Sequence, residues 1–290
     1  MMISLACPLC YGDLRNVMSS LICARCDARF PIADGVPNLT LASTLTADQA
    51  RVARDWDAMA DQYHAIIRGI GNRADAIDRP LLEIATGAVV EVGCGDGRFL
   101  ARLRAHGVRD ALGVDISSAM ASLAARNGHR VVVAPAESLP LADRSIDCCL
   151  SAYYSLRYAD LDRAMAEFGR VLRPGGRFGF TLLGARATRF SAAIVALPLL
   201  FHQETTWTAA DTIVGRARGI VLPNDVRDVD ELRKLCLVNA LTTDRITGFA
   251  RAPYLSGILD RFDRGALPVP SNLIAALAYD IVVIGHRSVL

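Results

Sequence analysis

The most constraining feature of the sequence is a glycine-rich stretch at residues 89–99, which reads VVEVGCGDGRF. A short apolar run enters this stretch, glycines follow at positions 93, 95 and 97, and the pattern after them is typical of a helix. Glycine adopts turn conformations that other residues disfavour, and it lets a ligand lie directly against the backbone. A strand, a glycine turn and a helix in this order form a nucleotide site at the end of the first strand of a doubly wound sheet.

Acidic residues around the turn indicate which nucleotide fits. Arg98 stands where dinucleotide-binding turns have their third glycine, and carboxylates at Glu91 and Asp96 would repel a pyrophosphate. They suit a cationic ligand such as S-adenosylmethionine (SAM), which carries a sulfonium and an ammonium group and no phosphate. Asp115 ends the next apolar run, 22 positions after Gly93, where an acid meets ribose hydroxyls. The alternative is a plain tight turn between a strand and a helix.

The E-x-G-x-G-x-G run and the acid at position 115 resemble the SAM site of class I methyltransferases. The segment LRYAD at 156–160 and the Pro-Gly-Gly turn at 174–176 resemble the type 11 group, in particular the ubiquinone and menaquinone C-methyltransferases. The resemblance covers roughly residues 50–183. It implies that SAM is bound by Tyr63, Glu91, Gly93, Cys94, Gly95, Asp115, Ile116, Ala136, Glu137 and Ser151.

Two further segments carry the resemblance. Residues 56–64 resemble a W-D-x-x-A-x-x-Y motif in which the tyrosine, here Tyr63, reaches the methionine end of SAM; the alternative is one apolar helix stripe. Residues 134–147 resemble the motif that holds adenine, but Pro135 replaces its first acid. Proline has neither an acceptor side chain nor an amide proton. The amide of Ala136 remains, and Glu137 or a carbonyl is the expected substitute acceptor.

Strand-like and helix-like runs alternate through the centre of the chain, which implies a parallel sheet. The expected fold is α/β: the Rossmann-like seven-stranded sheet of class I methyltransferases, helices on both faces, and a small N-terminal zinc ribbon. Ser43 or Thr44 is expected to cap the first helix, and Ser117 or Ser118 to begin a later one. The expected divisions are a ribbon at 1–40, a helical cap at 41–85, a SAM-binding core at 86–183, a lid insertion over the acceptor at 184–227, and a completion of the core sheet at 228–290.

Two CxxC knuckles lie within the first 26 residues, separated by 12 residues. Their four cysteines, Cys7, Cys10, Cys23 and Cys26, can surround one tetrahedral Zn²⁺ and leave no open position, so the expected metal is structural. The alternative is a redox-active CxxC pair. The segment resembles ribbons fused in front of bacterial methyltransferases, including one group that methylates a guanine of large-subunit ribosomal RNA. That group has a histidine as the last ligand. Loss of one cysteine is expected to unfold residues 1–40 and leave the core sheet standing.

The catalytic candidates lie near the carboxyl edge of the expected sheet. Methyl transfer needs a base only when the acceptor must lose a proton. His202 in the expected lid has a pKa suited to that role, and Tyr153 and Tyr154 follow the fourth strand. His64 and Glu204 are further candidates, and each of these side chains has a plain packing or surface role as its alternative.

Composition and charge reduce the number of possible functions. The net charge of +2 argues against a large phosphate-binding surface, and no apolar run reaches the ~18 residues of a membrane span. The first residues lack a signal-peptide pattern, and metal-type cysteine spacing suits a reducing compartment, so a cytoplasmic location is expected. The leading hypothesis is methylation of a small, fairly apolar aromatic or isoprenoid-like metabolite. The alternatives are an RNA base methyltransferase, suggested by the ribbon, and a catalytically silent SAM-binding or scaffold protein, suggested by Pro135.

Overall fold

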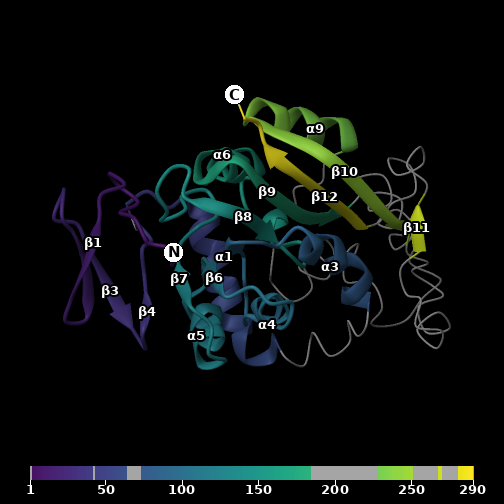
Figure 1. The fold of residues 1–290 in the computed structure, drawn as a ribbon. Coiled ribbons are helices and arrows are strands. Elements are labelled where there is room, and N and C mark those ends of the chain that lie inside the picture. The colour runs from purple at the N-terminus through teal and green to yellow at the C-terminus, as the bar shows by residue number, and fades with distance from the viewer. Residues whose placement is uncertain are drawn as a thin grey trace.

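The computed structural model describes residues 2–41, 43–63, 73–183, 228–250, 267–269 and 280–289 (Figure 1). The expected lid at 184–227, with its candidates His202 and Glu204, lies outside the described residues, and so does His64. None of the described helices has the length and the apolar character needed to cross a membrane.

One twisted sheet forms the centre of the molecule. Its order is β11-β10-β12-β9-β8-β5-β6-β7, in which β5 to β9 run parallel and β12, β10 and β11 run antiparallel to their neighbours. The seven predicted strands are present, and a short eighth strand, β11, extends the far edge. The strands are β5 Ala88–Val92, β6 Asp110–Asp115, β7 Val131–Val133, β8 Ile146–Ser151, β9 Leu172–Leu183, β10 Leu241–Ala250, β11 Leu267–Val269 and β12 Asp280–Arg287.

Helices cover both faces of this sheet, as the alternating pattern predicts (Figure 1). On one face, Phe168 of α6 and Leu232 of α9 belong to a single apolar cluster with strand residues such as Val90. On the other face, a second cluster joins α3, α4 and α5 to the sheet. The described helices are α1 Ala47–Met59, α3 Arg73–Glu83, α4 Arg98–Ala105, α5 Ser118–Arg126, α6 Leu161–Val171 and α9 Val229–Val238, with short 3-10 turns η1 Ala60–Gln62 and η2 Ser155–Tyr158.

Local sequence signals explain where these elements begin. Ser117 caps α5 as predicted, since its hydroxyl accepts from the amide of Met120. The prediction for α1 was wrong, because Thr46 caps it and forms a reciprocal capping box with Gln49. The predicted Pro-Gly-Gly turn falls where β9 loses register with β8, between the pairs Ile146–Leu172 and Cys148–Arg177.

The N-terminal ribbon is a separate four-stranded antiparallel sheet, with β1 Leu14–Val17, β2 Ser20–Cys23, β3 Arg29–Ala33 and β4 Val36–Pro37. It lies against β7, the edge strand of the large sheet, through a parallel bridge between Asn38 and Val133. Its buried residues Phe30 and Leu39 belong to the same apolar cluster as α6 and α9. The ribbon and the large sheet therefore share one core, while the expectation that the sheet is left standing when the ribbon unfolds stays a prediction.

We predict that Leu39→Ala destabilises the ribbon and the large sheet together. Leu39 is 1% exposed in the shared core, so its truncation should lower the free energy of unfolding by about 2–5 kcal/mol. Val17→Ala, at a ribbon side chain that is 46% exposed, is the matched control and should cost under about 0.5 kcal/mol. Chemical denaturation followed by far-UV circular dichroism measures both. A separate early transition that involves only the ribbon would contradict a shared core.

Candidate functional site

The glycine turn between β5 and α4 is the centre of the site. Gly93, Gly95 and Gly97 have φ angles of 73°, 54° and 82°, in the left-handed region that favours glycine. A Cβ atom on Gly93 would lie 2.3 Å from the Cβ of Ser155, so this position is closed to other residues. A Cβ on Gly95 would meet only ordinary contacts, the nearest with Met120 at 3.4 Å and the Tyr63 hydroxyl at 3.5 Å. The turn is therefore a cradle whose open side is Gly95.

Asp115, at the end of β6, holds this turn in place. Its Oδ2 accepts from the amide of Gly95 at 2.8 Å, and its Oδ1 accepts from the amide of Ser117 at 2.9 Å. Each carboxylate oxygen keeps a further lone pair, and the residue is partly exposed. Burial of the carboxyl group raises the pKa of Asp115 to about 6, although the two amide hydrogen bonds act in the opposite direction and lower it. The acid is therefore placed to accept hydroxyl groups of a ligand lying on the turn.

Glu91 supplies a second carboxyl group behind the turn. It is fully buried at the end of β5, and among the described residues neither of its side-chain oxygens has a hydrogen-bond partner. Burial raises its pKa well above the usual range, and the neighbouring Asp78, Asp115 and Asp96 raise it further. A buried acid without partners, surrounded by other acids, favours the arrival of a cation.

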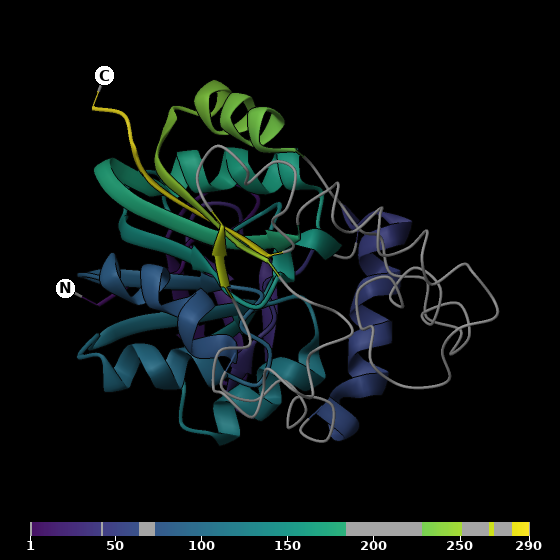
Figure 2. The same cartoon turned by 90° about the vertical axis from the view of Figure 1, so that its right-hand side faces the viewer.

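Helix α1 reaches this site from the side. Oδ1 of Asp57 accepts from the Ser117 hydroxyl at 2.6 Å and from the amide of Ala119 at 3.0 Å, so α1 is attached to the first turn of α5. Figure 2 shows α1 apart from the helices that cover the sheet faces, at one end of the strands. The attachment brings Tyr63 to Gly95, where burial and the charge of Asp96 raise the pKa of its hydroxyl.

Aromatic rings lie next to the cradle. Trp56 packs edge-on against Tyr63 and against Tyr158 of η2, with ring centroids 5.9 Å and 5.4 Å apart. The guanidinium carbon of the buried Arg157 lies 4.5 Å from the ring centroid of Tyr158. Trp56 and Tyr63 therefore pack together, and Tyr63 reaches the glycine turn, while its contact with the methionine end of SAM stays a prediction.

The expected adenine loop follows β7. One oxygen of Glu137 accepts from the amide of Asp160 at 2.8 Å, so this side chain joins the loop to the start of α6. Ser151, at the end of β8, donates to the carbonyl of Val92 at 2.8 Å and ties β8 to β5. The Cys94 thiol is buried against Gly113 and donates to the carbonyl of Gly95, within the turn, at 3.9 Å. Ile116 lies between Asp115 and the cap of α5.

The two tyrosines after β8 adopt strained backbone conformations. Tyr153 and Tyr154 have φ angles of 53° and 63°, which non-glycine residues seldom adopt and which cluster at functional sites. The Tyr153 ring packs edge-on against Phe99, and its buried hydroxyl lies beside Asp78 and Arg102. Burial raises the pKa of Tyr153, so its hydroxyl stays protonated at neutral pH. This favours a hydrogen-bonding role for Tyr153 over that of a base.

Sequence reasoning missed two residues that shape the site. Asp57 joins α1 to α5 by accepting from Ser117, which was predicted only as a helix start, and Ser155 donates to the carbonyl of Gly93 at 2.8 Å. Asp57 stood in a recognised motif and could have been singled out there. Ser155 carried no signal, because its partner is 62 residues away in the sequence.

The four predicted zinc ligands lie together at one end of the ribbon. All four sulfur atoms lie within 4.8 Å of one another, with Cys7–Cys26 at 3.7 Å and Cys10–Cys23 at 3.5 Å. Tetrahedral Zn²⁺ with Zn–S bonds of about 2.3 Å requires sulfurs about 3.8 Å apart. The amide of Arg25 donates to the Cys23 sulfur at 3.4 Å, which suits a thiolate ligand. The donor set and its spacing therefore fit one structural zinc ion.

Two family models match the chain. Residues 90–180 match the methyltransferase domain family, and residues 4–35 match the Trm112p-like protein family. Among curated proteins, the chain is 35% identical over 131 residues to an uncharacterized protein of Methanocaldococcus jannaschii, covering 44% of this chain and 49% of that protein. It is 35% identical over 153 residues to the malonyl-[acyl-carrier protein] O-methyltransferase of Methylovorus sp., covering 47% and 51%. The chain thus spans about half the length of these relatives.

Two solved structures illustrate the fold. A complex between the Haloferax volcanii Trm112 methyltransferase activator and a methyltransferase has a TM-score of 0.57 at 18% identity, covering 80% of this chain and 97% of that one. The geranyl diphosphate C-methyltransferase of Streptomyces coelicolor has a TM-score of 0.54 at 15% identity, covering 83% and 99%. At these identities the likeness concerns the fold alone.

We predict that affinity for SAM falls as the pH drops below about 6. The Asp115 carboxyl group has a raised pKa of about 6, and only its ionised form accepts two ribose hydroxyls, so protonation should weaken binding by up to about tenfold per pH unit. Asp115→Asn should bind about tenfold or more weakly at pH 8 and lose this pH dependence. Calorimetric titration from pH 5 to pH 8 tests both. Equal affinity of the variant and the wild type at pH 8 would refute the assignment.

We also predict one equivalent of zinc per chain. Elemental analysis of the purified protein should find it, and Cys26→Ser should reduce it because three thiolates bind the ion less well than four. Cys236→Ser, at a buried cysteine of α9 outside the ribbon, is the control and should leave the metal content unchanged. Less than half an equivalent in protein purified without chelators would count against the site.

Proposed function

We propose that this chain, a class I SAM-dependent methyltransferase with an N-terminal Trm112-like region, transfers a methyl group to a small, fairly apolar metabolite. The observation that carries the acceptor class is the aromatic group of Trp56, Tyr63 and Tyr158, of which Tyr63 lies beside Gly95. Aromatic walls with a few placed polar groups are typical of sites for small apolar ligands. An aromatic or isoprenoid-like acceptor suits such a wall.

The cofactor part of the proposal rests on the cradle and on the acids around it. When bound, SAM supplies an electrophilic methyl carbon. Asp115 would accept the ribose hydroxyls, and the carboxyl group of Glu91, which has no hydrogen-bond partner among the described residues, would favour a cationic ligand. Tyr63 would close the methionine end, and the amide of Ala136 would meet the adenine ring, with Glu137 beside it. The remaining SAM contacts expected from the resemblance, at Gly93, Cys94, Ile116 and Ser151, belong to the same proposal.

Catalysis would consist mainly of alignment. An acceptor held in line with the methyl carbon reacts without covalent help from the protein. Tyr153 and Tyr154 would position the acceptor, Tyr153 as a neutral hydroxyl. His202 remains the proposed base, in a proposed lid at 184–227. The proposed division of the chain is otherwise a zinc ribbon at 1–40, a helical cap at 41–85, a core at 86–183 and its completion at 228–290, in a protein of the cytoplasm.

The second candidate is an RNA base methyltransferase, and the ribbon is what favours it. Its charge does not: residues 1–40 carry three arginines (Arg15, Arg25 and Arg29), three aspartates (Asp13, Asp27 and Asp34) and no lysine or glutamate. A phosphate-binding surface needs an excess of basic residues. We therefore prefer the small acceptor. The third candidate is a catalytically silent SAM-binding or scaffold protein, and Pro135 is the residue that suggests it.

An assay with SAM labelled on its methyl group separates these functions. We predict that label appears in a small aromatic or isoprenoid acceptor from a mixed panel, and not in ribosomal RNA. Tyr158→Ala should raise the KM for that acceptor by about fivefold or more, because the ring is part of the wall, while Tyr158→Phe keeps the ring and stays near wild type. Label in RNA, with binding that weakens steeply in salt, would replace the leading proposal. SAM binding without any transfer would favour the silent protein.

A further inference from the structure

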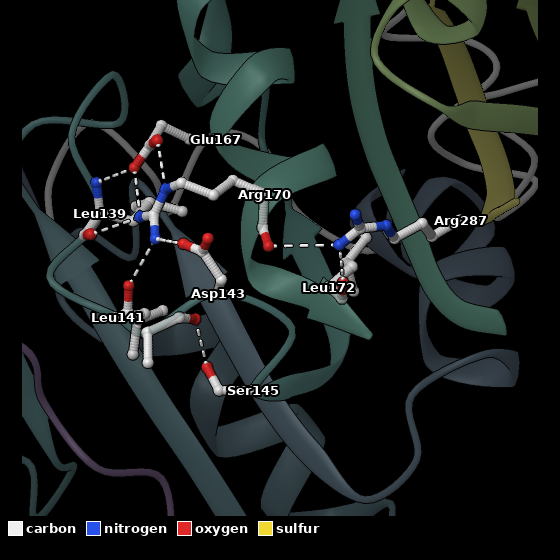
Figure 3. Close-up of polar contacts among 9 residues, drawn as sticks. Leu139, Leu141, Asp143, Ser145, Glu167, Arg170, Leu172 and Arg287 are labelled. Atoms are coloured by element: carbon white, nitrogen blue, oxygen red, sulfur yellow. Dashed lines mark hydrogen bonds and ion pairs between the residues drawn. The ribbon is translucent and has the colours of Figure 1, made fainter. Parts of the chain in front are cut away.

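Arg170, on the last turn of α6, lies outside the proposed cofactor site but is bound to the loop that follows β7. Its guanidinium donates to the carbonyl of Leu141 at 2.7 Å and to the carbonyl of Leu139 at 2.9 Å. It also forms an ion pair with Asp143 at 2.9 Å. Figure 3 shows these three contacts converging on one planar group. One side chain thus fixes two peptide groups and a carboxylate of the same loop.

Glu167, one turn earlier on α6, completes this arrangement. Its two oxygens accept from Nε and from a terminal nitrogen of Arg170, both at 2.7 Å. One of these oxygens also accepts from the amide of Leu139 at 2.6 Å (Figure 3). The Glu167–Arg170 pair therefore binds both the N–H and the carbonyl of Leu139. Charge-assisted, bidentate bonds of this kind are the strong ones.

The ribbon holds the same loop from its other side. The Tyr11 ring lies over the Arg170 guanidinium, 4.4 Å from its carbon to the ring centroid. The amide of Ala6 donates to the carbonyl of Pro140 at 2.9 Å, and Leu5 forms an antiparallel bridge with Leu141. Tyr11 directly follows the knuckle cysteine Cys10, so its position is set by the fold of the ribbon.

The start of the loop is also tied to the ribbon. The amide of Leu39 donates to the carbonyl of Val133 at 2.8 Å. The ribbon and Arg170 therefore fix positions 133 and 139–141, and the proposed adenine contacts at Ala136 and Glu137 lie between them. With Pro135 in place of an acid, position 135 offers adenine no side-chain acceptor, so adenine recognition depends on how the segment presents its backbone and Glu137.

We propose that Arg170 is a positioning residue for the adenine-binding loop and that Tyr11 of the ribbon supports it, so that both set the affinity for SAM from outside the site. This inference rests on the proposed SAM-binding function. It assigns to the ribbon a role in cofactor affinity, exerted through Arg170 and through the backbone contacts at positions 133, 140 and 141.

Calorimetric titration with S-adenosylhomocysteine tests the proposal. Arg170→Ala should weaken binding by about tenfold or more, because the loop loses its charge-assisted bonds. Arg163→Ala removes the same charge from an exposed position of the same helix and should leave affinity within about twofold. Arg170→Lys should fall between them, since an ammonium group cannot reproduce the planar fork.

Hydrogen exchange separates positioning from general destabilisation. In ligand-free Arg170→Ala, amide exchange should rise in residues 134–141 and stay unchanged in β5 and β6. Because Arg170→Ala removes several charge-assisted bonds, Tyr11→Ala is a milder second variant. It should weaken binding by about threefold, while Tyr11→Phe, which keeps the ring over the guanidinium, should match wild type.

The outcomes distinguish the two proposals. If wild-type protein binds neither SAM nor S-adenosylhomocysteine, the proposed function fails. If wild type binds and Arg170→Ala binds equally well, the positioning role is overturned and the proposed function stands. Faster exchange throughout the sheet, or an equal loss in Arg163→Ala, also overturns it. Should Arg170→Ala not fold, the two milder variants decide. Unchanged affinity of Tyr11→Ala overturns the part of the proposal assigned to the ribbon. Unchanged affinity of Arg170→Lys overturns the part assigned to Arg170.

Discussion

The carboxylate of Asp115 is the constraint on which the rest of the site depends. It joins the turn after β5 to the start of α5, because one oxygen binds the Gly95 amide and the other binds the Ser117 amide. Ser117 in turn donates to Asp57, which attaches α1 and places Tyr63 at the turn. A single acid at the end of β6 therefore organises two helices and a glycine turn through bonds within the protein itself. Such preorganisation lowers the entropy that binding must otherwise supply.

Burying several acids around the turn costs free energy. Glu91 is buried without a partner among the described residues, and Asp78, Asp96 and Asp115 all raise its pKa. One of these acids, Asp78, is balanced by an ion pair with Arg102 at 2.6 Å. The remaining negative potential would be relieved by a bound cation, since an opposite charge nearby favours the ionised form. A cluster of acids of this kind at one end of the sheet suits a site for a positively charged ligand.

Much of this arrangement could be predicted from the sequence, because the signals are local. Val131, Val132 and Val133 form a fully buried strand, and the two CxxC knuckles bring four sulfurs together. The rest could not be predicted for physical reasons. Thr46 caps α1 because Gln49 completes its capping box, a feature that a search for the first hydroxyl residue overlooks. Bonds such as Ser155 to Gly93 and Arg170 to Leu139 join distant residues, and nothing in the local pattern marks them.

The ribbon belongs to the same physical unit as the sheet. A segment of about 40 residues buries too little apolar surface to be stable alone, so it needs a metal, a larger partner, or both. Here its Phe30 and Leu39 pack into the core of the sheet. The sheet gains as well, because β7 is its edge strand and unpaired edges are open to non-native pairing. The bridge between Asn38 and Val133 covers part of that edge. Since the covered edge leads directly into the loop that Arg170 holds, whatever folds the ribbon also contributes to ordering the cofactor side of the sheet.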